Sequence, residues 1–596
     1  MRPGVRSLAI AAALACLSCP LAWGDTSKVT LAGDALSEEL ASVISDALPE
    51  EDAPVSAFQA RRQADRAADI ALRVLNSRAY FAADVTARAI NTNPLSAELM
   101  IEPGPQFTLS SVSIRYTEPQ AGQPSQNEIL ADIDIAPGDI AFPKAINAAQ
   151  KDITALLREK GYAFADTPRR EAIGDRSAGT LEVIYVITPG PKVALGNVKY
   201  PDGIRTKPTW LGRLEGFNPG EIYTPSALSQ FNSRLASTRL FDLASASLAD
   251  TPRETLPDGR EVYDVITTLD ERKRNTIATG VSLSTDRGLG ATIELERRNF
   301  SRRGDSISAD LTIAQLERAL GLKWDRPHEF GFGRNLTFGA AFAEEETDAF
   351  DSLTLDLRAG VEVERTPQVN FAFGLEAAQV RETVRLSQRT ADAADRDITL
   401  ANVYVAGQRD QSDSRLDPKR GWRADLRLEP TAAFGDSDAN FLRTVGQVRG
   451  YLPFGQAERT VLAGRLRLGS AFGASLSDLP SDRRYYSGGG GSVRGFAFQA
   501  IGPRTDDGEP LGGRSLAEAS LELRWAAWGR VGLVGFVDAG SVSQSELGFE
   551  DVRTGAGFGV RYQTAAGPIR ADIAVPVDRS DFDDPVQIYL SIGQAF

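Results

Sequence analysis

The chain has 596 residues, a formal net charge of −14 and two cysteines. Its acidic balance opposes nucleic-acid binding, because phosphate backbones attract positively charged surfaces. Both cysteines, Cys16 and Cys19, lie near the start, so the rest of the chain has no disulfide framework and no cysteine metal site.

The first residues have the pattern of a secretory signal peptide. Two arginines precede an apolar segment, residues 8–19, that is too short to span a bilayer, and small residues near Gly24 suit a cleavage site. We therefore expect residues 1–24 to be removed on export. A lipoprotein signal ending before Cys16 or Cys19 and a short buried helix are the alternatives. No later apolar stretch is long enough to predict a transmembrane helix.

The first half of the chain repeats. IEPGPQFTLSSVSI (101–114) and ITPGPKVALGNVKY (187–200) share one pattern, and in each a PGP follows an alternating segment that predicts a strand. Ile146, Ile153 and Leu157 form a stripe typical of an amphipathic helix. We predict three α+β units with the order strand, two helices, two strands, covering residues 27–105, 106–191 and 192–270. Three unrelated α+β domains are the alternative.

The second half alternates between apolar and polar residues. Near the end of the chain, Arg561, Arg570 and Asp572 stand opposite apolar neighbours. Apolar residues outside and charges inside are the pattern of a transmembrane β-barrel, and residues 271–596 hold about 16 such antiparallel segments. A soluble β-sandwich also alternates, but it does not normally bury arginines on its inner face.

A glycine-rich stretch, SGGGGSVRGFAFQ, covers residues 487–499. A phosphate-binding loop would need a lysine and a following helix, and neither is predicted here. The stretch lies instead in the longest predicted barrel connection, residues 470–513. An aspartate in a spanning strand, Asp538, has to face the lumen and needs a cation there. We therefore expect the loop to fold inward and Arg494 to pair with Asp538; a solvent-exposed arginine is the alternative.

These motifs resemble those of the BamA/TamA outer-membrane superfamily, which has a VRGF/Y loop motif and an F-x-D-x-G strand motif whose aspartate pairs with the loop arginine. The corresponding residues are Val493, Arg494, Gly495 and Phe496 in the loop and Phe536, Asp538 and Gly540 in the strand. The repeated units resemble POTRA modules, which are periplasmic β-α-α-β-β domains that receive client chains by strand addition. Three such units before a barrel resemble the TamA-type subunit of the translocation and assembly module.

The resemblance implies a protein that inserts others, such as autotransporter-like β-barrels, into the outer membrane of a Gram-negative bacterium. The implied partners are membrane lipid, unfolded outer-membrane clients and an inner-membrane-anchored TamB-like protein. We expect no enzymatic activity, cofactor or metal, because His328 is the single histidine and no catalytic set is present. The alternative is a two-partner-secretion-type pore that exports one dedicated soluble protein; a passive porin agrees less well with the three periplasmic units.

The last strand is expected to meet the first at a weak seam. Gly593 lies inside that strand, where glycine weakens pairing. A weakly paired edge invites foreign strands, so a client strand is expected to add there. The chain ends on Phe596, which resembles the terminal assembly signal of bacterial outer-membrane proteins.

Overall fold

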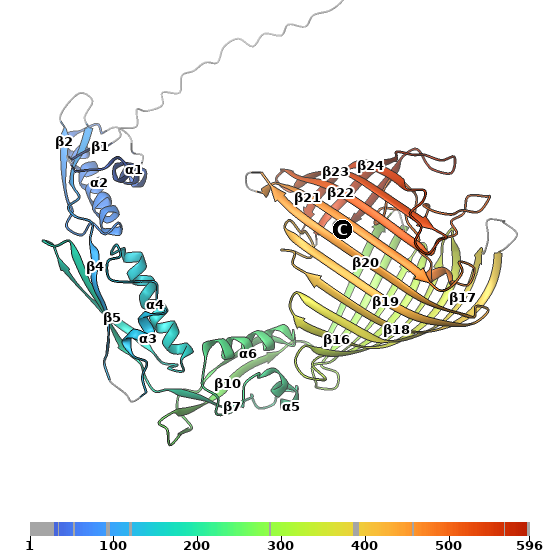
Figure 1. The fold of residues 1–596 in the computed structure, drawn as a ribbon, viewed down its shortest axis with the longest axis horizontal. Helices are drawn as coiled ribbons and strands as arrows, with labels where there is room; N and C mark the ends of the chain where they lie inside the picture. Colours follow the sequence, from blue (N-terminus) through green and yellow to red (C-terminus); the bar gives the residue numbers. More distant parts are fainter. Residues whose placement is uncertain are drawn as a thin grey trace, which may run out of the picture. The chain divides into compact units, whose positions relative to one another are not determined.

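The computed structural model describes residues 29–592, except 34, 50, 52–53, 91–95, 119–121, 285–287, 386–392, 456–457 and 565–566. The predicted signal peptide, Gly593 and Phe596 lie outside the described residues. The chain divides into two compact units, and each is described by itself (Figure 1). The first comprises residues 1–197, 218–229 and 248–264, and the second comprises residues 198–217, 230–247 and 265–596.

The first module contains β1 (Thr30–Ala32), α1 (Glu38–Ala47), α2 (Ala57–Ser77), β2 (Asp84–Ile90) and β3 (Ser96–Glu102). Its sheet has the order β1-β3-β2, with β1 parallel to β3. Ser37 and Ser56 cap the two helices, because each hydroxyl accepts a backbone N–H of the first turn. Ile44, Leu75 and Leu99 are buried between helices and sheet.

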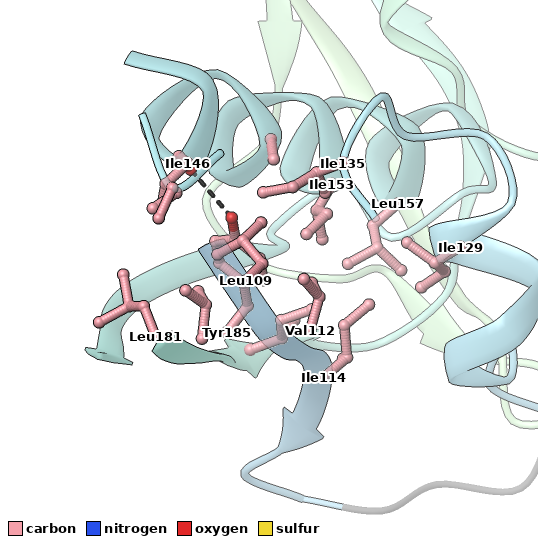
Figure 2. Close-up of a cluster of buried hydrophobic side chains, with 14 of the residues drawn as sticks. Leu109, Val112, Ile114, Ile129, Ile135, Ile146, Ile153, Leu157, Leu181 and Tyr185 are labelled. Carbon is pink, nitrogen blue, oxygen red and sulfur yellow. Dashed lines mark hydrogen bonds between the residues drawn. The ribbon is translucent and has the colours of Figure 1, made fainter. Parts of the chain in front are cut away.

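The second module contains β4 (Thr108–Tyr116), α3 (Gln126–Leu130), α4 (Pro143–Glu159), β5 (Asp166–Asp175) and β6 (Thr180–Thr188), in a sheet of order β4-β6-β5. Proline begins α4, where its missing N–H costs no helical hydrogen bond. Figure 2 shows Ile146, Ile153 and Leu157 of α4 directed at the sheet. The Tyr185 hydroxyl donates to the Ile146 carbonyl at 3.0 Å and so satisfies a buried polar group.

The third module contains β7 (Val193–Lys199), α5 (Pro208–Leu211), η1 (Gly212–Leu214), α6 (Pro225–Ser237), β8 (Phe241–Leu248), β9 (Glu254–Thr255) and β10 (Glu261–Glu271). Its sheet has the order β7-β10-β8, and β9 pairs with β10. Each PGP stands between the last strand of one module and the first strand of the next. The predicted β-α-α-β-β order is therefore confirmed in all three modules.

The second half forms a 16-stranded sheet whose strands pair in chain order, each antiparallel to the next (Figure 1). The strands are β11 (Asn275–Ser284), β12 (Gly288–Arg298), β13 (Ser306–Ala314), β14 (Glu317–Arg326), β15 (Arg334–Glu346), β16 (Phe350–Thr366), β17 (Val369–Arg385), β18 (Ala393–Asp410), β19 (Gly421–Gly435), β20 (Ala439–Phe454), β21 (Thr460–Phe472), β22 (Ser515–Trp528), β23 (Val531–Ser543), β24 (Arg553–Thr564), β25 (Gly567–Pro576) and β26 (Gln587–Ile592). Cα atoms of β11 and β26 approach within 8 Å, so the sheet closes into the predicted barrel.

The barrel has apolar side chains on its outer face and charged side chains inside, the reverse of a water-soluble domain. Along β22, Leu521 and Leu523 point outward and are 54% and 48% exposed. The alternate residues, Glu522 and Arg524, point inward and are buried. This two-residue period is the one expected when the outer face meets lipid and the inner face is polar.

A tryptophan joins the third module to the barrel within the second unit. Trp210 is fully buried, and its Nε1 donates to the Pro327 carbonyl at 3.1 Å. Gly304, at φ +69°, leaves room for the indole ring. His328 stacks on the same ring, with 5.9 Å between ring centroids, and on Phe332 at 4.7 Å. The turns that follow β12 and β14 therefore form a socket for one side chain of the module.

A buried ion-pair network around Arg494

The loop between β21 and β22, residues 473–514, folds into the barrel and brings Arg494 into its interior. The Arg494 side chain is 1% exposed. Gly488, Gly489 and Gly495 all have φ above +100°, a conformation that is easy for glycine alone. The glycine-rich stretch thus permits the sharp backbone turns that carry the arginine to the wall.

Arg494 contacts three carboxylates from three strands. Its Nε and Nη2 donate to the two oxygens of Asp538 at 2.6 and 3.0 Å, in a bidentate geometry. Its Nη1 donates to Glu522 at 2.6 Å and to Asp572 at 3.3 Å. The Phe536 ring lies against the guanidinium, with its centroid 3.4 Å from Cζ. One loop side chain therefore links β22, β23 and β25.

Further arginines balance the charge of this cluster. Arg561 pairs with Asp572, and Arg524 Nε donates to Glu522 at 2.8 Å. Arg570 Nε lies 3.4 Å from Asp572, while its Nη2 donates to the Gly490 carbonyl of the loop at 2.8 Å. Buried charges are tolerated when they are paired and hydrogen-bonded. The three predicted lumenal charges, Arg561, Arg570 and Asp572, thus lie in the same network as Arg494.

Two strand glycines leave room for the loop at the wall: Gly540 of the strand motif on β23 and Gly555 on β24. A Cβ on Gly540 would lie 2.6 Å from Cγ2 of Val493, and a Cβ on Gly555 would overlap the Arg494 carbonyl oxygen. Val493 and Phe496 are both buried beside these positions. Glycine in the strand motif therefore makes room for the loop side chains of Val493 and Ser487, and glycine at 555 makes room for the loop backbone itself.

The sequence prediction named Asp538 as the partner of Arg494 and omitted Glu522. The signal was present, because alternation along LAEASLELRW places Glu518, Glu522 and Arg524 on one face. Glu518 lies beside the loop as well: Arg465 Nη2 donates to it at 3.2 Å and to the Ser492 carbonyl at 2.9 Å. The rule that placed Asp538 in the lumen applies equally to these glutamates.

A second anchor ties the same loop to a different part of the wall. Arg396 on β18 donates through Nε to Glu382 on β17 at 2.9 Å, and both side chains are buried. The Ser481 N–H donates to the other oxygen of Glu382 at 2.8 Å, and Arg396 Nη2 donates to the Leu479 carbonyl at 3.0 Å. The loop is therefore held both at β17–β18 and at β22–β25.

The last strand also contacts the loop, whereas its described residues form no ladder with the first strand. The Tyr589 hydroxyl on β26 accepts from the Gly495 N–H at 3.0 Å and donates to the Phe496 carbonyl at 2.7 Å. Over the parts of β11 and β26 that the structure describes, no ladder joins the two strands. The two ends of the sheet are thus neighbours without described strand pairing.

The described stretches contain neither a membrane-spanning helix nor a cluster of metal-ligating side chains. No helix there is both long and apolar enough to cross a bilayer. No group of three or more His, Cys, Asp or Glu side chains there is placed to hold a metal ion.

Comparison with known proteins gives two family matches. The Omp85 superfamily domain matches residues 299–596, and the POTRA family, described as a surface antigen variable number repeat, matches residues 124–190.

Curated relatives and a solved structure are similar over most of the chain. The outer membrane protein assembly factor BamA of Nitratidesulfovibrio vulgaris is 24% identical over 471 residues, covering 76% of this chain and 58% of that protein. BamA of Neisseria meningitidis serogroup B is 22% identical over 557 residues, covering 84% and 68%. The crystal structure of BamA from Haemophilus ducreyi lacking POTRA domains 1–3 has a TM-score of 0.69 at 19% identity, covering 82% of this chain and 99% of that one. This chain therefore spans 58% of the length of the first relative.

Proposed function

Because this chain belongs to the Omp85 superfamily and is an outer-membrane barrel with periplasmic POTRA modules, we propose that it inserts other β-barrel proteins into the outer membrane. The observation that carries the proposal is the pairing of Arg494 with Asp538 inside a 16-stranded barrel. The loop motif and the strand motif of the superfamily meet in that pair. The names of the two BamA relatives support assembly as the activity.

The proposed route for a client is the seam between β11 and β26. An unpaired strand edge presents free N–H and C=O groups, so an incoming client strand can complete the ladder. The described residues show no ladder between these strands, which supports an edge available for exchange. No step of this activity requires a catalytic residue or a cofactor.

The proposed branch of the superfamily is the TamA type. Three β-α-α-β-β modules precede the barrel, with proposed boundaries of 27–105, 106–191, 192–270 and 271–596. The proposed clients are autotransporter-like β-barrels, and the proposed partner is an inner-membrane-anchored TamB-like protein. Unfolded clients would first pair with the edges of the module sheets.

A seam lock tests the assembly activity. Single cysteines at residues 275–281 and 587–591 are combined in pairs, and pairs that crosslink on oxidation lock β11 to β26. The control pair replaces Thr292 and Thr312, which already face each other across the β12–β13 ladder. We expect oxidation to stop insertion of a barrel client only in the seam-locked protein. Unchanged client insertion with the seam crosslinked would refute the proposal.

A double-mutant cycle tests the pairing at the centre of the network. Arg494→Ala leaves buried carboxylates without their cation and is expected to cost about 3–5 kcal/mol. Arg318→Ala is the control, because Arg318 is an exposed barrel arginine paired with Glu344. Loop release is measured by protease cleavage within residues 473–514. Additive effects of Arg494→Ala and Asp538→Ala would contradict the pair, because coupled residues are non-additive.

The partner proposal is tested by purification from native membranes followed by mass spectrometry. A large inner-membrane-anchored β-rich protein among the copurifying chains is the expected result. Assembly lipoproteins would instead indicate a BamA-type core machine, and one abundant secreted protein would indicate a dedicated export pore.

A further inference from the structure

Tyr589 occupies the buried face of the last strand. It is 2% exposed, whereas its neighbours Ile588 and Leu590 point outward and are 55% and 40% exposed. The ring packs with Val534, Phe536 and Ala574 in one buried cluster. Phe536 is also the ring that lies against the Arg494 guanidinium. Tyr589 thus belongs to the same buried cluster as the ring that lies against Arg494.

The hydroxyl of Tyr589 makes two hydrogen bonds to the loop backbone on either side of one peptide. It accepts from the N–H of Gly495 at 3.0 Å and donates to the carbonyl of Phe496 at 2.7 Å. These residues directly follow Arg494 in the chain. A Cβ on Gly495 would lie 2.8 Å from the Val575 carbonyl, so the loop backbone is pressed against β25 at this point. Movement of the loop away from the wall would break both hydrogen bonds.

The cross-strand position of Tyr589 adds a third connection. Its partner in the β25–β26 ladder is Asp572, the carboxylate that Arg494 and Arg561 share. That ladder pairs only residues 569–574 with 587–592 in the described part of the two strands. The hydrogen bonds of Tyr589 therefore attach the described inner face of β26 to the loop. The loop itself is anchored by buried ion pairs.

We propose that Tyr589 is a positioning residue that makes the last strand respond to the seating of the Arg494 loop. This inference rests on the proposed function, because it assigns regulation to the seam. With the loop seated, the two hydrogen bonds hold β26 against β25. With the loop displaced, β26 loses them and its edge becomes free to accept a client strand. Tyr589 makes no contact with a client in this account and acts through the strand that carries it.

Hydrogen–deuterium exchange of residues 587–592 in the full-length protein, without any client, tests the inference. Tyr589→Phe keeps the ring and removes both hydrogen bonds, and we expect about tenfold faster exchange in β26. The control is Tyr562→Phe, which removes the same hydroxyl from an outward-facing position on β24. We expect the control to leave exchange in β26 unchanged. Equal exchange in Tyr589→Phe and wild type would overturn the proposal.

The Arg494→Ala background separates positioning from simple local stabilisation. Arg494→Ala by itself should accelerate exchange in β26 although Tyr589 is intact, and adding Tyr589→Phe should then have little further effect. The same acceleration factor in both backgrounds would show that Tyr589 stabilises β26 independently of the loop and would overturn the inference. Hydrogen exchange is measured without a client, so it tests the role of Tyr589 independently of client insertion. A failed seam-lock experiment would overturn the proposed function, whereas only the exchange rates of β26 decide whether Tyr589 couples this strand to the loop.

Discussion

The second module and the barrel bury opposite kinds of side chain. In the module, α4 packs Ile146, Ile153 and Leu157 against a sheet, and apolar area removed from water stabilises the fold without strict geometry. In the barrel, β22 buries Glu522 and exposes Leu521. The barrel interior depends on charges that meet their partners at hydrogen-bond distance. We therefore expect the barrel lumen to lose more stability when one charged partner is removed than the module core loses with a small decrease in volume.

The largest expected effect is the loss of one buried carboxylate. Glu522→Ala leaves Arg494 and Arg524 without one of their anions, and we expect destabilisation of about 3–5 kcal/mol. Urea unfolding in lipid vesicles measures it. Glu344→Ala is the matched control, since Glu344 pairs with Arg318 at an exposed site where pairing contributes little. Equal destabilisation by the two variants would remove the distinction between lumen and exposed wall.

A charge placed on the outward face of the same strand should cost somewhat less. Leu521→Arg puts a cation opposite lipid, and we expect about 2–4 kcal/mol of destabilisation near the bilayer midplane. The yield of folded barrel in lipid vesicles measures the effect. Leu521→Met conserves apolar character and should fold as wild type does. Full tolerance of Leu521→Arg would show that this face does not meet the hydrocarbon core.

A single methyl group removed from the module core should have a smaller effect. Ile153→Val is expected to cost about 0.5–1.5 kcal/mol, because the lost contacts are dispersed over several neighbours. Hydrogen exchange along α4 in the full chain measures it. Lys151→Ala changes an exposed position of the same helix and should leave α4 nearly unchanged. A loss as large as that of Glu522→Ala would contradict the comparison.

At neutral pH the smallest effect is the one at His328, between the third module and the barrel, because it appears only as the pH falls. Burial, and then the nearby charges of Arg234 and Arg213, lower the pKa of His328 from 6.5 to about 4. A histidine with a lowered pKa stabilises the fold fully above pH 6.5, and this stability is lost as the pH falls toward 4. We expect faster exchange around Trp210 at pH 5 than at pH 7.5. In His328→Phe, exchange around Trp210 should not increase at pH 5. An equal increase in the variant would show that a titrating group other than His328 causes the pH dependence.

Much of the architecture could be predicted from the sequence because it follows from the spacing of apolar residues along each helix and strand. The 3.6-residue stripe of α4 and the two-residue alternation of the barrel are set by backbone geometry, so each identifies its own buried face. Alternation also placed Asp538 in the lumen and suggested a long-range cation for it. Alternation along its strand also places Glu522 in the lumen. The residues near each carboxylate in the sequence do not indicate that one arginine is shared among three carboxylates.

The three modules, the number and polarity of the barrel strands and the two motifs that meet in the lumen all follow from local sequence patterns. Three contacts depend on the folded chain: Arg494 lies among Glu522, Asp538 and Asp572. Tyr589 bonds a loop 94 residues away in sequence, and Trp210 enters a socket between barrel turns. The physical reason is that strand and helix periods act within a few residues. These contacts form only after the sheet has closed and brought distant segments within hydrogen-bond reach.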